Sequence, residues 1–297
     1  MTTVTSGTLI EIKNILFLTD FSASATVAAP YAAEIAKQFG AKLHVLHAIP
    51  PIVNPMTAPS TWPMVEEAAR ISAEEERKEL LAEFSGIPID IFIEEGDLGS
   101  IVDTIVEKNN IDLIVVGTRG RTGLAKLVLG STAERIFRHA RCPVLTVGPF
   151  ATNFQLKPGK ITSIVYATDF SAESTVARAY ALSLAQELQA HLTLLHVIDS
   201  PKPGDLSQSA DLVASLKERI RALVPPEAEL WCDPECVVEQ GPTAETILQV
   251  AKREDAGLIV LGVRWPTGFP GAATHLPIAT AHQVVSGARC PVLTVRH

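Results

Sequence analysis

One sequence pattern occurs twice in this chain of 297 residues, once in each half. The run Leu18-Thr-Asp-Phe-Ser22 returns 149 residues later as Ala167-Thr-Asp-Phe-Ser171. Three further markers recur at offsets of 149, 145 and 148 residues: Leu46-His47 with Leu195-His196, Ile114-Val-Val-Gly117 with Ile259-Val-Leu-Gly262, and Arg141-Cys-Pro-Val-Leu-Thr-Val147 with Arg289-Cys-Pro-Val-Leu-Thr-Val295. A period this long predicts a duplicated domain rather than an array of short repeats.

The duplication divides the chain into two predicted domains, residues 1–148 and 161–297. Each is close to the roughly 150 residues of an ordinary domain, so each can bury its own core. The stretch 149–160 carries Pro149, Pro158 and Gly159 and few apolar residues, which is typical of a linker.

Apolar runs and helical patterns alternate along each half. In the first half, strands are predicted at 14–19, 42–49, 87–93, 112–116 and 143–147, and helices near 22–39, 64–84, 99–109 and 131–139. Strands separated by helices of this length require parallel crossovers. The sequence therefore predicts an α/β fold with two tandem doubly wound domains.

Composition disfavours several functional classes. The formal charge is -8 and both halves are acidic, whereas a nucleic-acid-binding domain usually carries a basic surface. No apolar run approaches the roughly 18 residues of a membrane span, and the first nine residues do not resemble a secretory signal. We therefore expect a cytoplasmic protein that contacts neither nucleic acid nor membrane.

A glycine-rich pattern follows the fourth predicted strand of the first half. Gly117-Thr-Arg-Gly120 is followed, after nine residues, by Gly130-Ser131-Thr132 at the start of a predicted helix. Glycines let the backbone approach a ligand closely, and the free amides of a helix start favour an anion. Residues 119–141 also contain six basic residues and one acidic residue. This combination indicates a polyanion site, with plain turns and a solvated helix face as the alternative.

Thr19 and Asp20 follow the first predicted strand. In open parallel sheets, ligands bind beyond the carboxyl ends of the strands, so we expect this pair to lie near Gly117. Asp20 could ligate a metal, but one carboxylate does not make a catalytic site. Neither a Walker loop nor a Gly-x-Gly-x-x-Gly run after the first strand is present, which disfavours P-loop hydrolysis and dinucleotide chemistry.

The cysteines fit structural roles better than chemical ones. Cys142 and Cys290 hold matching positions before the last strand of each half, where a small buried residue is expected. Cys232 and Cys236 have no further zinc ligands at a suitable spacing, so they are interpreted as structural thiols with a redox pair as the alternative.

Together these motifs resemble the universal stress protein family. The resemblance rests on Gly-x2-Gly-x9-Gly-Ser, on Thr-Asp-Phe-Ser and on the closing Cys-Pro-Val-Leu-Thr-Val strand, and it covers essentially the whole chain as a tandem two-domain member. It implies a five-stranded parallel sheet of order 3-2-1-4-5, flanked by helices, in each domain. It also implies bound ATP, commonly with magnesium, and domains that pair through their last strands.

The resemblance further assigns a nucleotide site to the first half. It puts Thr19 and Asp20 near the ribose and phosphates, with Asp20 able to reach a phosphate-bound ion, and it puts the Ala48 backbone against adenine. The other residues that it assigns to ribose and phosphates are Val116, Gly117, Arg119, Gly120, Gly130, Ser131 and Thr132.

The second half departs from this pattern. When Cys290 is aligned with Cys142, Ile278 and Ala279 stand opposite Gly130 and Ser131, and the preceding loop is three residues longer. That loop is rich in proline and aromatic residues, which suits filling a pocket or contacting a partner better than wrapping a triphosphate. Thr168-Asp169 is retained, so a different ligand stays open there.

The leading hypothesis is an ATP-binding stress-response sensor or regulator that holds one nucleotide, in its first domain. The alternatives are a slow ATPase or nucleotidyl-transfer enzyme that uses the same pocket, and a nucleotide-free interaction scaffold. The expected partners are an adenine nucleotide and a protein that the sequence does not identify. Val144–Val147 and Val292–Val295 are expected to pair within one chain, and a larger homodimer stays open.

Overall fold

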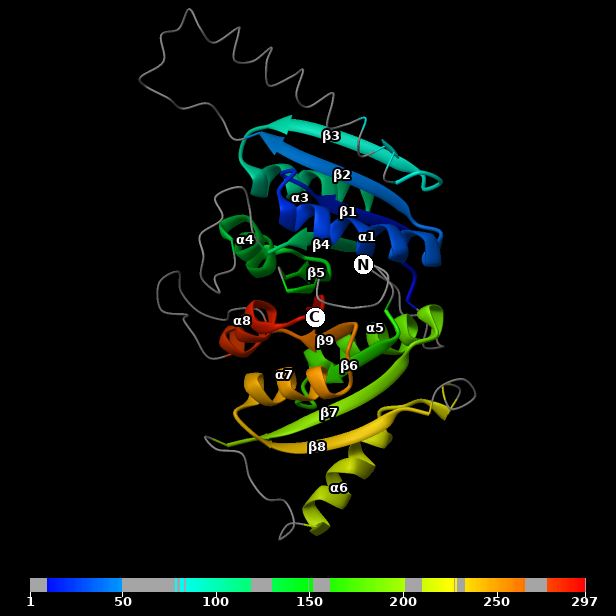
Figure 1. The fold of residues 1–297 in the computed structure, drawn as a ribbon, viewed down its shortest axis with the longest axis vertical. Helices are drawn as coiled ribbons and strands as arrows, with labels where there is room; N and C mark the ends of the chain where they lie inside the picture. Colours follow the sequence, from blue (N-terminus) through cyan, green and yellow to red (C-terminus); the bar gives the residue numbers. More distant parts are fainter. Residues whose placement is uncertain are drawn as a thin grey trace, which may run out of the picture.

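The structure is a computed structural model that describes nine ranges and two single residues of the chain (Figure 1). The described residues are 10–49, 78, 81–82, 84–118, 130–148, 150–151, 161–200, 210–226, 228, 233–264 and 277–296. Most of the helix predicted at 64–84 and most of the linker predicted at 149–160 lie outside these residues, as do Arg119 and Gly120 of the predicted nucleotide site.

Strands and helices alternate in both halves. The first half contains β1 (Asn14–Leu18), α1 (Ala23–Phe39), β2 (Lys42–Ile49), β3 (Ile89–Glu95), α3 (Leu98–Asn109), β4 (Leu113–Gly117), α4 (Ser131–His139) and β5 (Val144–Val147). The second half contains β6 (Ser163–Ala167), α5 (Ala172–Leu188), β7 (His191–Asp199), α6 (Ala210–Arg221), β8 (Glu235–Gly241), α7 (Thr243–Arg253), β9 (Leu258–Gly262), α8 (Pro277–Gly287) and β10 (Val292–Val295).

The ten strands form one sheet in the order β3-β2-β1-β4-β5-β10-β9-β6-β7-β8. Within each half every pairing is parallel, and the order 3-2-1-4-5 predicted for each domain is confirmed. Leu18 pairs with both Leu46 and Val116, so the carboxyl ends of β1, β2 and β4 meet at one edge. That edge is where the sequence places the ligand site.

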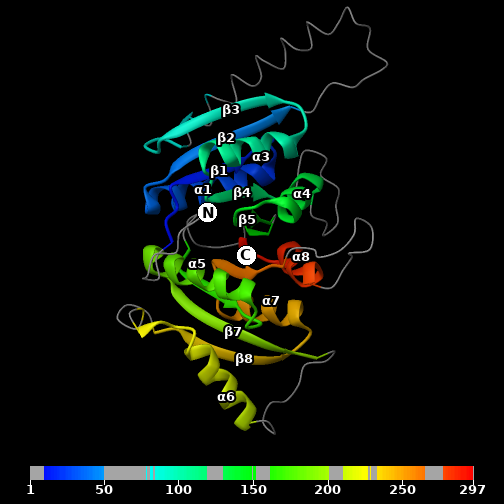
Figure 2. The ribbon, with the colours of Figure 1, turned by 180° about the vertical axis from the view of Figure 1, so that it is seen from behind.

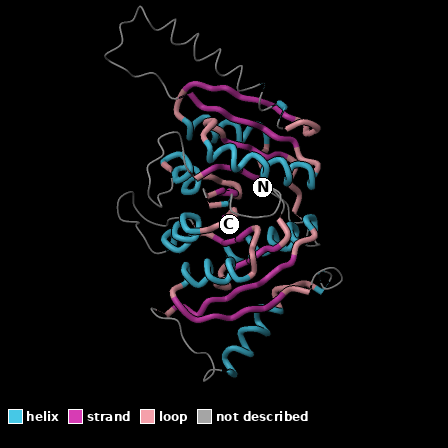
Figure 3. The backbone as a smooth tube through the Cα atoms, in the orientation of Figure 1, coloured by secondary structure: helices cyan, strands magenta, loops and turns pink. Residues whose placement is uncertain are grey.

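Helices cover both faces of the sheet (Figure 3), and each strand divides its side chains between them. On β1, Ile15 and Phe17 face the layer that contains α1, whereas Leu16 and Leu18 face the layer that contains α3 and α4. The same alternation places α5 on the first face and α7 and α8 on the second. Strands that are buried on both faces, such as β1, β4 and β9, read as continuous apolar runs, as expected for a parallel sheet, whereas the edge strand β3 is partly exposed.

The two halves join where β5 and β10 pair antiparallel, in the middle of the molecule (Figures 1 and 2). Leu145 lies opposite Leu293, and the Thr294 hydroxyl donates to the Val144 carbonyl at 3.3 Å. The expected pairing of the last strands within one chain is therefore present. Closing β5 against β10 also removes two exposed sheet edges.

Arg296 links the end of β10 to α4 of the other half. Its guanidinium donates to the carbonyls of Phe137 and Arg138, the latter at 2.6 Å, and lies over the Phe137 ring. Burial lowers the pKa of Arg296 to about 10, which still leaves the group protonated at neutral pH. A cation at the carboxyl end of a helix is favourable. In the described part of the chain, no helix is both long and apolar enough to cross a membrane.

Candidate functional site

The Thr19-Asp20-Phe21-Ser22 turn shapes one side of the predicted nucleotide site. Thr19 extends the β1–β2 ladder, because its amide donates to the Leu46 carbonyl at 3.0 Å. The Thr19 hydroxyl then accepts the Phe21 amide, and Asp20 Oδ1 accepts the Ser22 amide, both at 3.0 Å. Ser22 caps α1 by accepting the Ala25 amide. The side chains of the turn thus fix the backbone that leads into the helix.

His47 holds this turn from the neighbouring strand. Its Nδ1 lies 3.0 Å from the Thr19 carbonyl, and its ring packs against Phe21 at a centroid distance of 4.8 Å. Phe21 has a φ of 58°, a left-handed conformation that is uncommon for a bulky residue. Hydrogen bonds on both sides of Phe21 explain why the chain tolerates this conformation.

The end of β4 lies next to the turn and forms the base of the glycine-rich loop. Val116 is buried and pairs with Leu18, so Gly117 follows beside Thr19. The Gly130 amide donates to the Thr118 carbonyl at 2.7 Å, which brings the two ends of the loop together. The Thr118 hydroxyl is buried and has no hydrogen-bond partner within the described ranges.

Helix α4 begins at this base without a side-chain cap. The N-cap residue is Gly130, which has no side chain to accept a hydrogen bond from the helix. The N-cap residues of α1 and α3, Ser22 and Asp97, each accept such a bond. Thr132 is exposed in the first turn, and Ser131 is the first helical residue. The first-turn amides therefore have no partner from the N-cap side chain and can serve an anion.

Three of the six basic residues counted near this loop pair with the protein's own carboxylates. Arg135 makes a bidentate contact with Asp97 at 2.6 and 2.7 Å, Arg138 pairs with Glu134, and Arg141 pairs with Glu107. The Arg135 hydrogen bonds hold the pKa of Asp97 well below its usual range. These three arginines consequently add little net charge to a ligand site. Arg119, Arg121 and Lys126 lie outside the described residues.

The chain matches the universal stress protein family over residues 11–148 and again over residues 160–296. It belongs to the universal stress protein family. A universal stress protein of Mycolicibacterium smegmatis is 28% identical over 297 residues, which cover 95% of this chain and 96% of the relative. One of Methanocaldococcus jannaschii is 36% identical over 139 residues, 46% of this chain and 81% of the relative. A solved universal stress protein from Archaeoglobus fulgidus shares the fold, with a TM-score of 0.69 at 22% identity over 95% of this chain and 98% of that chain.

The second domain of this universal stress protein repeats the turn closely. The Thr168 hydroxyl accepts the Phe170 amide at 3.0 Å, Asp169 Oδ1 accepts the Ser171 amide at 2.9 Å, and Phe170 has a φ of 60°. His196 Nδ1 lies 2.8 Å from the Thr168 carbonyl. The duplicated motif therefore codes the same local structure twice, whether or not the glycine pattern follows it.

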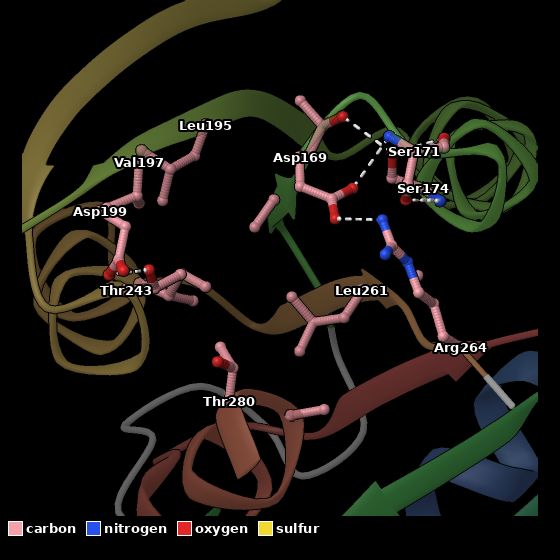
Figure 4. A pocket seen from close by; sticks show the side chains of 15 residues that line it. Asp169, Ser171, Ser174, Leu195, Val197, Asp199, Thr243, Leu261, Arg264 and Thr280 are labelled. Carbon is pink, nitrogen blue, oxygen red and sulfur yellow. Dashed lines mark hydrogen bonds and ion pairs between the residues drawn. The ribbon is translucent and has the colours of Figure 1, made fainter. Parts of the chain in front are cut away.

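A cavity of about 340 Å³ opens at the carboxyl edge of β6, β7 and β9 in the second domain (Figure 4). Gly262 at the end of β9 sits so close to α5 that a Cβ there would overlap the Ser174 amide and the Glu173 backbone. Arg264 and Asp199 also line this cavity, and the sequence reasoning missed both. A signal was available for Arg264, which follows Gly262 as Arg119 follows Gly117.

The cysteine thiols that the structure describes all have raised pKa values. Burial raises the pKa of Cys142 and of Cys290 to about 12, so both stay protonated at neutral pH. Burial also raises the pKa of Cys236, while Cys232 lies outside the described residues. Among the residues that the structure describes, three or more histidine, cysteine or acidic side chains do not gather anywhere as a metal site would require.

Proposed function

We propose that this universal stress protein binds ATP in its first domain and acts as a nucleotide-responsive regulator. The observation that carries the proposal is the hydrogen bond from the Gly130 amide to the Thr118 carbonyl. It brings the two described ends of the glycine-rich loop together near Thr19, and the helix that follows, α4, begins after Gly130 without a side-chain cap. A phosphate group at the start of α4 would accept hydrogen bonds from the backbone amides of the first turn.

The remaining predicted contacts fit the same arrangement. Ala48 lies near the end of β2, two strands from Val116 and Gly117, which would flank the ribose. Arg119 and Gly120, which stand between the two described ends of the loop, complete the proposed set with Ser131 and Thr132. We assign no catalytic role to any of these residues.

A magnesium ion fits this site as an accompaniment of the phosphates. The donor set offers one half-buried carboxylate, Asp20, whose Oδ1 already accepts the Ser22 amide. Magnesium commonly takes one or two carboxylates and completes its shell with phosphate oxygens and water. Asp20 would hold such an ion, which would neutralise part of the phosphate charge.

Regulation would follow from a difference in ATP affinity between two conformations, because a ligand shifts an equilibrium only by that difference. Helix α4 is suited to report occupancy, since its start faces the proposed phosphates and its end is held by Arg296 of the other domain. A protein partner that recognises one of the two conformations would then be controlled by ATP.

Isothermal titration of the full chain with ATP and magnesium tests the proposal. We expect a stoichiometry near one nucleotide per chain. A stoichiometry of two would contradict the assignment to the first domain alone. If the wild-type protein binds no adenine nucleotide in the titration and carries none by mass spectrometry, the nucleotide-free scaffold replaces the proposal.

A further inference from the structure

The second-domain cavity has an apolar wall of a size that suits a small molecule. Leu195 and Val197 of β7 face it, together with Ile247 of α7 and Leu261 of β9 (Figure 4). Its volume of about 340 Å³ lies at the small end of ligand pockets, which usually measure roughly 300–1,000 Å³. A compact organic body can therefore be enclosed between these four side chains.

At one end of the cavity, two carboxylates already balance the positive charge of Arg264. Arg264 lies 3.6 Å from Asp169 Oδ2 through Nη2 and 3.5 Å from Glu173 Oε2 through Nε. Asp169 also accepts the Ser171 amide at the start of α5. Two carboxylates thus flank Arg264, the one arginine among the described residues that line the cavity, and Asp169 already accepts an amide at the start of α5. An incoming phosphate would meet these carboxylates rather than a free cation.

At the other end stands a carboxylate without a cationic partner in the described part of the chain. Asp199, the last residue of β7, accepts the Thr243 hydroxyl at 2.8 Å, and Thr243 begins α7. The hydrogen bond orients the carboxylate at the cavity, where Figure 4 shows both side chains beside Val197. In the aligned position of the first half the chain has Pro50, so this acid belongs to the second half alone.

We propose that this cavity binds a small organic cation, an amine on a short apolar body, with the amine against Asp199 and the body against the apolar wall. A protonated amine would pair with Asp199, for which the described residues provide no cation, and the apolar body leaves water on entering. The two carboxylates beside Arg264 disfavour a nucleoside polyphosphate in this cavity. The proposal concerns the second domain and does not depend on ATP binding in the first.

Two probes of the same shape test the charge. Phenethylamine and 2-phenylethanol differ at neutral pH chiefly in the positive charge of the amine. By calorimetry with the full chain at low ionic strength, we expect phenethylamine to bind about tenfold more tightly, because one charge-assisted hydrogen bond contributes roughly that factor. The substitution Asp199→Asn should abolish the preference and leave the weaker affinity for 2-phenylethanol unchanged.

Two further variants separate a specific site from general charge or misfolding. Glu245→Gln removes an exposed carboxylate from α7, the helix that Thr243 begins, where Glu245 contacts Gln249. This variant should keep the tenfold preference for phenethylamine. Val197→Phe fills the cavity from its half-exposed wall and should abolish binding of both probes. Unfolding curves establish that each variant is folded before it is titrated.

Several outcomes overturn the proposal. Equal affinities for the two probes in the wild type would remove the role of Asp199, as would an amine preference that survives Asp199→Asn. Absence of phenethylamine binding at millimolar concentration would remove the site. Competition between ATP and phenethylamine in the wild type would show that the cavity takes nucleotide. A failed ATP titration with an intact amine preference would overturn the proposed function and leave this inference standing.

Discussion

Helices α4 and α8 occupy the same position in the two halves, yet they differ at both ends. Helix α4 starts after Gly130 with no side-chain cap, whereas α8 carries Ile278 and Ala279 at the aligned positions. At the other end, Arg296 donates to two α4 carbonyls, while its counterpart Gly148 has no side chain, and a Cβ there would lie 3.4 Å from the carbonyl of Ala288, which follows α8. Duplication therefore kept the helix and changed what its two ends can bind.

The difference teaches that a repeated fold does not repeat its electrostatics. The turns at Thr19 and Thr168 are nearly identical in hydrogen bonding, so the scaffold beneath both edges is the same. The two edges differ in a few side chains on that scaffold. Asp199 gives the second edge an acid that the first lacks, and Gly130 leaves the first an open helix start.

The largest expected effect comes from closing that helix start. Gly130→Asp supplies a carboxylate that both caps α4 and repels phosphate, and opposed like charges cost several kcal/mol. We expect the ATP affinity to fall about a hundredfold or more while the melting temperature is unchanged or higher. Gly130 has a φ of -62°, so Gly130→Ala should fold without strain and keep most of the affinity. Unchanged affinity in Gly130→Asp, measured by calorimetry, would remove the phosphate site from α4.

The next effect concerns the other end of the same helix. Arg296→Met leaves the Phe137 and Arg138 carbonyls without their donor, and unsatisfied acceptors of this kind cost roughly 1–3 kcal/mol each when buried. We expect a loss of about 2 kcal/mol in the free energy of unfolding by urea titration. Gly148→Ala, at the matching position, makes ordinary contacts and should change stability by less than about 0.5 kcal/mol. Equal effects of the two substitutions would mean that the junction is energetically symmetric.

Substitution of His47 and His196, which support the two turns, tests whether the halves contribute equally to stability but differently to ATP binding. His47→Ala and His196→Ala each remove a hydrogen bond and a ring contact, at 3.0 and 4.8 Å in one case and 2.8 and 4.6 Å in the other. Each should lower stability by about 1 kcal/mol. His47→Ala alone should also weaken ATP binding, because it loosens Thr19. A comparable loss of ATP affinity in His196→Ala would contradict the asymmetry.

The smallest effect is expected where α3 meets α4. Asp97→Asn weakens the exposed contact with Arg135 and should lower the melting temperature less than Arg296→Met does. Because folding holds the pKa of Asp97 below its usual value, its contribution is complete above the ordinary carboxyl range near pH 4 and is lost as the pH falls further. Melting curves of the two proteins should therefore converge between about pH 4 and pH 2. A gap that stays constant over this range would show that Asp97 acts through packing.

The sequence predicted those features that depend on local pattern and strand direction. The apolar runs and the spacing of the helices were enough to indicate parallel strands, whereas the strand order came from the family resemblance. Parallel strands made Thr19 and Gly117 neighbours despite 97 intervening positions. Arg135 and Arg141 were harder to interpret, because their partners Asp97 and Glu107 lie more than thirty residues away. A charge count along the chain does not detect such neutralisation.

Other features had no signal in the sequence. Arg296 follows the last strand, and only the antiparallel register of β5 and β10 brings it to α4. The placement of the Asp199 carboxylate at the cavity likewise follows from the fold, because Asp199 and its partner Thr243 belong to different elements and are 44 residues apart. Positions that act through contacts between distant segments require the fold before their role can be stated.

The junction of the two domains also has a consequence for how the protein is made. Val144 and Thr294 are paired across the junction, and 150 residues of chain separate them. At synthesis rates of roughly 5–20 residues per second, β10 leaves the ribosome on the order of ten to thirty seconds after β5. During that interval the first domain, if it folds early, presents β5 as an open strand edge to every nascent neighbour. Polysomes are therefore where this fold is most exposed to wrong pairing between chains.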